Sequence, residues 1–283
     1  MKTGLILEGG SCKGIFTAGV LDYWMEQNLM FPYVVSVSAG TCNALDYLSN
    51  QIGRTKQSML ADKKDSYYGI RRLIKTGHLL DLDRVFGEYV YELFPFDGEA
   101  YFNADCKNEI VVTNCRTGKP EYLVEKKDLK KLLAIGKASS SMPLFADMVE
   151  IDGELYLDGG MADSIPVIRA MEEEKCDKAV VIMTHNEGYV PSVSKQLAKL
   201  FHRKYREYPK FVETLCNRPI MYQKQLEAMR QYEKEGRVLV IRPEMPAVKR
   251  LERDRTKMEQ FFEHGYQIGK DTFDKVMHFI NED

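Results

Sequence analysis

Three short stretches of the sequence contain residues that could carry out acyl transfer, and a serine is the centre of the first. Ser38 follows the apolar run 33–37 and precedes Ala39 and Gly40. A serine at a sharp strand-to-helix junction with small neighbours forms a nucleophile elbow, which exposes its hydroxyl at the carboxyl edge of a sheet. The usual pattern is G-x-S-x-G, and here Ser36 replaces the first glycine. The junction predicts a nucleophile at Ser38, in an elbow supported by Ser36, Ala39 and Gly40.

The second stretch is a glycine-rich loop between a short apolar run, residues 5–7, and an apolar helix. Its residues are Gly9, Gly10, Ser11, Cys12, Lys13 and Gly14. Such a loop exposes backbone N–H groups at the amino end of a helix, where they can stabilise negative charge. The lysine position does not fit a nucleotide P-loop, and a serine occupies the second glycine position of the dinucleotide pattern. Because two consecutive strand-to-helix junctions would meet at one sheet edge, we expect an oxyanion hole beside the serine. A plain turn without a ligand is the alternative.

The third stretch is Asp158, which ends a predicted hairpin over 150–157 and precedes Gly159 and Gly160. Asp152-Gly153 is the expected tight turn of this hairpin. The glycines after Asp158 would allow another backbone segment to approach closely. An Asp-Gly pair alone usually marks a turn and nothing more, so both interpretations stay open at this point.

The elements that would position these residues alternate between apolar runs and helical segments. The runs predict strands over 5–7, 33–37, 109–114, 121–124, 178–184 and 237–242, besides the hairpin. Residues 54–105 are charged and aromatic, and we interpret them as a helical insertion that covers the site, or as an outer layer. Residues 192–230 are predicted to be helical, and residues 254–280 are predicted to form one long closing helix.

Composition excludes several classes of function. The chain of 283 residues has 40 basic and 42 acidic side chains, so no global field recruits nucleic acid or an anionic membrane. Its six cysteines are scattered singly, which argues against structural zinc and predicts a reduced, cytoplasmic protein without a metal or cofactor. No apolar stretch has the length of a signal peptide or a membrane span. The basic, aromatic region 191–230 could contact a membrane surface transiently, although a solvated face is the favoured interpretation.

Together the three stretches resemble the patatin-like phospholipase family, whose motifs are D-G-G-G-x-R-G, G-x-S-x-G and D-G-A/G. The resemblance covers about residues 5–183. It implies a three-layer α/β/α fold with a mainly parallel central sheet, a catalytic domain over 1–190 and a C-terminal helical extension over 191–283. It also implies that Ser38 and Asp158 form a catalytic dyad without histidine. The loop 9–14 would be the oxyanion hole, and the substrate a lipid or other acyl ester.

Four residues depart from the family motifs: Glu8, Ser11, Lys13 and Ser36 replace aspartate, glycine, arginine and glycine. The family's oxyanion donors are backbone N–H groups, so the side-chain changes in the loop need not abolish the hole. Ser11 adds a Cβ at a position where we expect the loop to have a positive φ. The oligomeric state is not fixed by any of these features.

Three alternatives to a lipid hydrolase with a dyad stay open: one concerns the catalytic residues and two concern the function. His185 ends a predicted strand, and Ser38, Asp158 and His185 follow the chain order of an α/β-hydrolase triad. The dyad is favoured because that fold does not place a glycine loop and helix before its elbow in this way. The function could also be an esterase or thioesterase for small soluble substrates, or lipid binding without catalysis.

Overall fold

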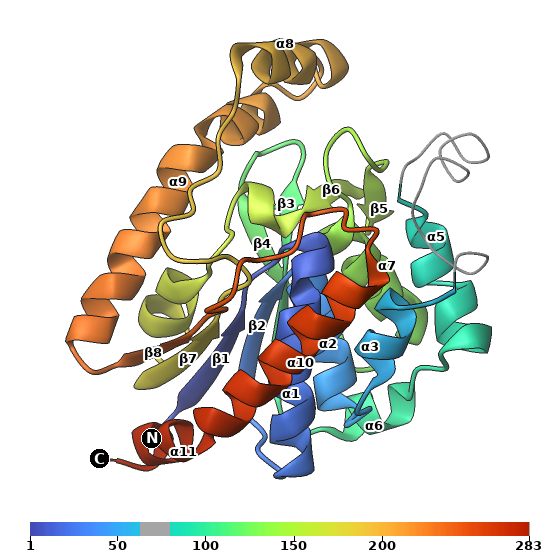
Figure 1. The fold of residues 1–283 in the computed structure, drawn as a ribbon. Helices are drawn as coiled ribbons and strands as arrows, with labels where there is room; N and C mark the ends of the chain where they lie inside the picture. The colour runs from blue at the N-terminus through green and yellow to red at the C-terminus, as the bar shows by residue number, and fades with distance from the viewer. Residues whose placement is uncertain (63–79, 283) are drawn as a thin grey trace.

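The fold is organised around an eight-stranded sheet, in a computed structural model that describes residues 1–62 and 80–282 (Figure 1). The strand order is β5-β6-β3-β2-β1-β7-β8, and β4 pairs with β3 beside this path. The strands are β1 (Thr3–Leu7), β2 (Tyr33–Val37), β3 (Lys107–Asn114), β4 (Pro120–Leu123), β5 (Val149–Ile151), β6 (Glu154–Asp158), β7 (Lys178–Ile182) and β8 (Val238–Ile241).

The centre of the sheet is parallel and one side is antiparallel. Parallel ladders join β3, β2, β1, β7 and β8 in that order. Antiparallel ladders join β3 to β4, β3 to β6, and β5 to β6. The two predicted hairpins are therefore confirmed as β3–β4 and β5–β6, and the predicted last strand pairs with β7 inside the same sheet. The carboxyl ends of β1 and β2 lie side by side, because Leu7 is in register with Ser36.

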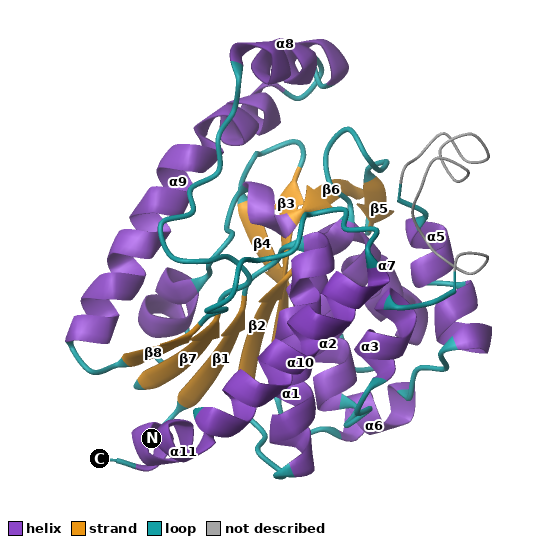
Figure 2. Ribbon diagram, viewed as in Figure 1, coloured by secondary structure: helices purple, strands orange, loops and turns teal. Residues whose placement is uncertain are grey.

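Helices cover both faces of the sheet, which confirms the predicted α/β class (Figure 2). They are α1 (Gly14–Glu26), α2 (Ala39–Leu48), α3 (Arg54–Met59), α5 (Leu82–Val85), α6 (Gly98–Asn103), α7 (Leu129–Ser140), α8 (Lys195–Lys204), α9 (Pro209–Lys234), α10 (Arg255–Asp271) and α11 (Phe273–Asn281). Alternation within β1 divides the core: Leu5 and Leu7 pack with α1, α2 and α10, whereas Ile6 packs with α9.

The last part of the chain packs tightly on the first helix. A Cβ at Gly265 of α10 would lie 2.1 Å from the carbonyl oxygen of Phe16, and one at Gly19 of α1 would lie 2.3 Å from that of Phe262. Only glycine permits this backbone approach, so α1 and α10 are in direct backbone contact. Residues far apart in sequence thereby form one face of the core.

Both helical regions predicted in the C-terminal third are divided into two helices, so the single closing helix predicted over 254–280 is wrong in its continuity. The predicted helical region 192–230 is divided into α8 and α9, because the chain turns at 205–208 and Pro209 suits the first position of a new helix. The predicted helix 254–280 is divided at Thr272, which ends α10 and begins α11. The break allows α11 to reach the sheet, where Lys178 Nζ donates to the carbonyl of Phe279 at 2.8 Å.

The described part of the predicted insertion, residues 54–62 and 80–105, consists of short helices joined by turns and loops. It contains α3, α5, a single π turn (Tyr89–Leu93) and α6. Residues 63–79 of the predicted segment lie outside the described part. In residues 1–62 and 80–282, no helix combines the length and apolar character that a membrane span needs.

Candidate active site

The elbow predicted at the end of β2 is present. Ser38 has φ 54° and ψ −121°, a backbone conformation that non-glycine residues rarely adopt. Gly40 packs against the end of β1, where a Cβ on residue 40 would lie 2.6 Å from the carbonyl oxygen of Leu7. Ser36 is fully buried in β2 and its hydroxyl lies 3.4 Å from that of Thr41. Serine thus fits the position of the family's first elbow glycine, and Ala39 begins α2.

The structure brings Ser38 and Asp158 together across 120 residues of sequence. Ser38 Oγ donates a hydrogen bond of 2.7 Å to Asp158 Oδ2. The other carboxylate oxygen accepts the N–H of Gly160 at 2.8 Å, and the hydroxyl of Thr113 binds the Asp158 carbonyl at 2.8 Å. The pairing of β6 with β3 holds this aspartate beside the elbow, with Gly159 packed against the backbone of Val111.

The environment of Asp158 makes its carboxylate a stronger base than an exposed aspartate. Burial raises the pKa of Asp158 above its ordinary value. The hydrogen bonds from Ser38 and Gly160 and the charges of Arg218 and Arg250 act in the opposite direction, and burial prevails. A carboxylate with a raised pKa takes a proton from a hydroxyl more readily than a free aspartate does.

The glycine loop lies directly against the elbow. A Cβ at Gly9 would lie 2.9 Å from the Cβ of Ser38. Ser11 has φ 51°, so the positive φ expected at this position is present and carried by a serine. Within the described ranges, no hydrogen bond engages the N–H groups of Gly10 and Ser11. The loop therefore offers two free backbone donors beside the serine hydroxyl.

The remaining loop residues anchor the loop. The N–H of Cys12 donates to the carbonyl of Arg250 at 3.2 Å, and burial raises the pKa of the Cys12 thiol to about 11, so it stays protonated and unreactive. Gly14 starts α1 against Ala39, where a Cβ would lie 2.8 Å from the alanine side chain. Burial, with the nearby charge of Arg250, lowers the pKa of Lys13.

His185 binds Glu8, whereas the serine's hydrogen-bond partner is Asp158. His185 Nδ1 lies 2.9 Å from Glu8 Oε1, and its ring stacks on Tyr189 at 3.8 Å. Glu8 Oε1 also accepts the hydroxyl of Tyr222 at 2.6 Å, and Oε2 accepts the N–H of Thr184 at 2.6 Å. Burial alone would raise the pKa of Glu8, but the charge of His185 and these hydrogen bonds hold that pKa below its ordinary value. The Thr184 hydroxyl also binds the Gly9 carbonyl at 2.6 Å, so this buried cluster fixes the start of the glycine loop.

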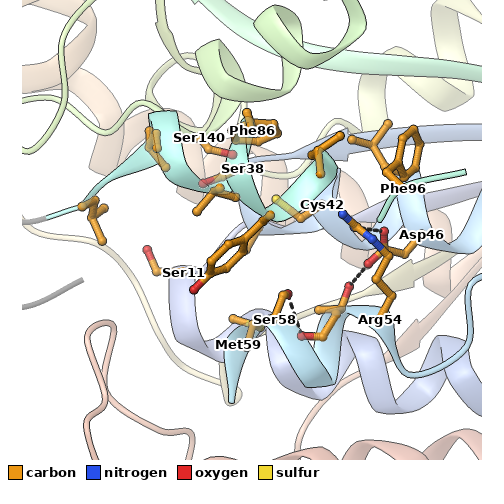
Figure 3. A pocket seen from close by; sticks show the side chains of 18 of the residues that line it. Ser11, Ser38, Cys42, Asp46, Arg54, Ser58, Met59, Phe86, Phe96 and Ser140 are labelled. Carbon is orange, nitrogen blue, oxygen red and sulfur yellow. Dashed lines mark hydrogen bonds and ion pairs between the residues drawn. The ribbon is translucent and has the colours of Figure 1, made fainter. Parts of the chain in front are cut away.

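Two cavities meet at Ser38 and Ser11. The larger one runs between α2, α3 and the segment 80–96, and its walls enclose about 960 Å³, a volume that includes the open mouth (Figure 3). Its lining is largely apolar and includes Leu45, Met59, Leu82, Val85, Phe86 and Phe96. The ion pair of Arg54 with Asp46 lies in its wall, away from Ser38. The smaller cavity is more polar and contains Asp158, His185, Arg218 and Arg250.

The family of this chain follows from its sequence match. Residues 5–171, more than half of the 283 residues, match the patatin-like phospholipase family. The chain belongs to this family. A second match, over residues 208–281, is to a domain of unknown function, DUF6363. The region of the patatin-like match contains the elbow, the glycine loop and Asp158, whereas α9, β8 and α10 belong mainly to the second match.

Two known proteins are similar to this patatin-like chain. The uncharacterized protein YjjU of Escherichia coli (strain K12) is 30% identical over 185 residues, which cover 61% of this chain and 49% of that protein. The chain thus spans about half the length of this curated relative. The crystal structure of VipD from Legionella pneumophila aligns with a TM-score of 0.52 at 12% identity, over 97% of this chain and 67% of that one. This second likeness bears on the fold alone.

Several side chains of the patatin-like site carry no signal that sequence reasoning could use. Ser139, near the end of α7, accepts the N–H of Ser38 at 2.9 Å. Tyr222, Arg218 and Arg250 come from the C-terminal third, where they are indistinguishable from other residues of their type. A group of three or more His, Cys, Asp or Glu side chains able to hold a metal ion does not occur in the part of the chain that the structure describes.

Proposed function

We propose that this protein is a serine acyl hydrolase that cleaves ester bonds of lipids through Ser38 and Asp158. The observation that carries the proposal is the 2.7 Å hydrogen bond from Ser38 Oγ to Asp158 Oδ2, at the mouth of a largely apolar cavity. A hydroxyl bound to a carboxylate of raised pKa is an activated nucleophile in acyl transfer. The family membership supports the same reaction.

The proposed reaction has two steps. Asp158 accepts the proton of Ser38 while Oγ attacks the ester carbonyl, and the alcohol leaves with a proton returned by Asp158. Water then attacks the acyl-serine while Asp158 accepts its proton, and Asp158 returns this proton to Ser38 Oγ as the acid is released. The N–H groups of Gly10 and Ser11 are the proposed donors to the oxyanion in both steps, and one such donor is worth roughly 2.7–4 kcal/mol.

The large cavity favours lipid esters over small soluble ones. Side chains of Leu45, Met59 and Phe86 line it beyond Ser38, and an acyl chain would bury its methylene groups against them at about 0.8 kcal/mol each. A small soluble acyl group would leave most of this surface uncovered. An esterase for short acyl groups is therefore the second candidate. Lipid binding without catalysis is disfavoured, because it would give the hydrogen-bonded Ser38–Asp158 pair no chemical role.

Contact with a membrane surface is part of the proposal. Six exposed basic residues lie on α8 and the segment around it: Lys195, Lys199, Arg203, Lys204, Arg206 and Lys210. The neighbouring aromatic side chains Phe201, Tyr205 and Phe211 are buried, whereas the basic groups face solvent and could approach anionic headgroups. Figure 1 shows α8 projecting from the body at one end of α9.

The test compares four proteins by fluorophosphonate labelling and by hydrolysis of a long-chain ester. Ser38→Ala should abolish labelling, and Asp158→Asn should reduce hydrolysis by roughly 10³- to 10⁴-fold, as in other serine hydrolases that lose the partner of the nucleophile. His185→Gln should retain labelling and measurable hydrolysis. A protein that needs His185 and tolerates Asp158→Asn would contradict the dyad, and absence of labelling in wild type would contradict hydrolysis.

A further inference from the structure

Two arginines from the C-terminal third line the small cavity at the dyad. Arg218 is on α9, and its Nε donates a hydrogen bond of 2.7 Å to the carbonyl of Gly160. Arg250 is on the loop between β8 and α10, and its backbone carbonyl accepts the N–H of Cys12 in the glycine loop. One arginine is thus attached to the Asp158 turn and the other to the proposed oxyanion loop.

The charges of these arginines are not neutralised by ion pairs. In residues 1–62 and 80–282, no carboxylate oxygen lies within 4.0 Å of a side-chain nitrogen of Arg218 or Arg250. The terminal nitrogens of Arg218 have no hydrogen-bond partner in the same ranges, and Arg250 Nη1 has only the sulfur of Met142 at 3.4 Å. Most arginine nitrogens are free to bind an oxyanion, for which the planar guanidinium is well suited.

The carboxylates of the cavity are already engaged. Glu8 accepts hydrogen bonds from Tyr222 and Thr184 and is paired with His185, while Asp158 accepts the hydroxyl of Ser38. The imidazole of His185 lies in the same cavity wall and is 6% exposed, yet its Nε2 has no partner among the described residues. The cavity therefore combines two unpaired cations with an unpartnered ring nitrogen.

The position of the small cavity suits the alcohol half of an ester substrate. If the acyl chain occupies the apolar cavity on one side of Ser38, the alcohol half must lie on the other side. That side contains Arg218 and Arg250. An alcohol half that carries a phosphate would place its charge among the unpaired arginines.

We propose that Arg218 and Arg250 form a phosphate-binding site for the alcohol half of the substrate, so that residues 208–281 select phosphate-bearing lipids. This proposal rests on the proposed acyl hydrolase function. It gives the segment that matches DUF6363 a role in the active site. A phosphate held there would also orient the ester carbonyl toward Ser38, because the two cavities meet at that residue.

The kinetic test uses two substrates with the same acyl chains in identical neutral detergent micelles: a diacylglycerol phosphate and the corresponding diacylglycerol. Wild type should prefer the phosphate-bearing substrate in kcat/KM. Arg218→Gln and Arg250→Gln should each lower the ratio of the two kcat/KM values by roughly 10- to 100-fold, the range for losing a hydrogen bond to a charged group. Lysine at either position should restore part of the ratio, since it retains the charge without the planar fork.

Arg230→Gln on the exposed side of α9 and Arg253→Gln three residues after Arg250 are matched controls. They should leave the ratio unchanged. The proposal is overturned if wild type shows no preference for the phosphate-bearing lipid, or if Arg218→Gln and Arg250→Gln change both substrates in parallel. A general loss of activity or folding lowers both kcat/KM values equally, so it leaves their ratio unchanged.

A binding test separates this proposal from the proposed hydrolysis. Glycerol 3-phosphate, inorganic phosphate and glycerol would be titrated into Ser38→Ala by calorimetry. We expect glycerol 3-phosphate to bind and glycerol not to bind, with binding lost when Arg218→Gln and Arg250→Gln are added. This result would support the site even if wild type hydrolyses neither lipid. Inorganic phosphate binding more tightly than glycerol 3-phosphate, or no phosphate binding at all, would overturn a lipid headgroup site.

Discussion

The hydroxyl of Tyr222 donates a hydrogen bond of 2.6 Å to Glu8 Oε1. This contact joins α9 to the residue that precedes the glycine loop, across 214 residues of sequence. Glu8 also pairs with His185 and binds the N–H of Thr184, two residues that follow β7. The Glu8 carboxylate therefore connects three parts of the fold: the carboxyl end of β1, the segment after β7, and helix α9. The C-terminal third is thereby attached to the floor of the proposed oxyanion hole.

Tyr222→Phe should therefore destabilise the protein. The substitution removes a buried hydrogen bond to a charged group, which is worth about 1.5–3 kcal/mol in unfolding free energy. The pKa of Glu8 is lowered in the folded state, so the ionised Glu8 carboxylate stabilises the fold fully above its ordinary pKa of 4.5. This stabilisation is lost as the pH falls through the folded-state pKa, and it is therefore fully present at pH 7. Urea unfolding at pH 7 should show a lower midpoint with an unchanged m-value. Tyr91→Phe, at a side chain that is 56% exposed, is the control, and equal effects of the two variants would contradict the role of the Glu8 contact.

The rate of hydrolysis of a neutral ester should fall on the acid side as Asp158 becomes protonated. Burial raises the pKa of Asp158, so this limb should lie at higher pH than the ordinary aspartate pKa of 3.8. The charge of Arg250 lowers the same pKa, so Arg250→Gln should displace the limb toward higher pH. A pH profile of kcat/KM measures both effects. Arg253→Gln should have the wild-type profile, and a displacement toward lower pH in Arg250→Gln would contradict the assignment of Asp158 as the base.

Ser11→Gly should stabilise the protein. Ser11 has φ 51°, a backbone conformation that costs a non-glycine residue roughly 1–2 kcal/mol and that glycine adopts without this cost. Glycine also gives the unfolded chain more conformational freedom, which offsets about 0.5–1 kcal/mol of the stability gained. The variant keeps the backbone N–H that the proposed oxyanion hole uses. Chemical denaturation should show an increase in unfolding free energy of up to ~1 kcal/mol. Ser11→Ala retains the strain and should show no gain; equal stabilities of the two variants would contradict the strain argument.

Cys42→Phe should change the acyl-chain preference. Cys42 lies one helical turn after Ser38 on α2 and lines the apolar cavity. A phenyl ring there would fill the space next to the nucleophile, so kcat/KM should fall by roughly tenfold or more for long-chain esters relative to acetyl esters, as expected when a 1–3 kcal/mol contact is lost. A series of esters with increasing chain length measures the preference. Cys42→Ser preserves the volume and should retain the wild-type order; a parallel fall for all chain lengths in Cys42→Phe would argue against an acyl-chain cavity.

The sequence was sufficient to predict the strands, both hairpins and the α/β class. Local signals carry this information: β-branched runs for strands, Asp152-Gly153 for a turn, and small residues around Ser38 for the elbow. The continuity of the closing helix over 254–280 was predicted wrongly, because helical periodicity persists through Thr272 while the packing of α11 against the sheet decides where the chain turns. Tertiary contacts decide such breaks, and periodicity does not report them.

The sequence by itself determined that a serine elbow, a glycine loop and an Asp-Gly-Gly turn occur in the order of the patatin-like motifs, because each depends on the geometry of a few consecutive residues. Only the tertiary structure decided that Asp158, rather than His185, is the hydrogen-bond partner of Ser38. It also decided that Arg218 and Arg250 reach the same cavity. The physical reason is that strand pairing and helix packing bring together side chains more than a hundred residues apart, and no local pattern encodes these distances.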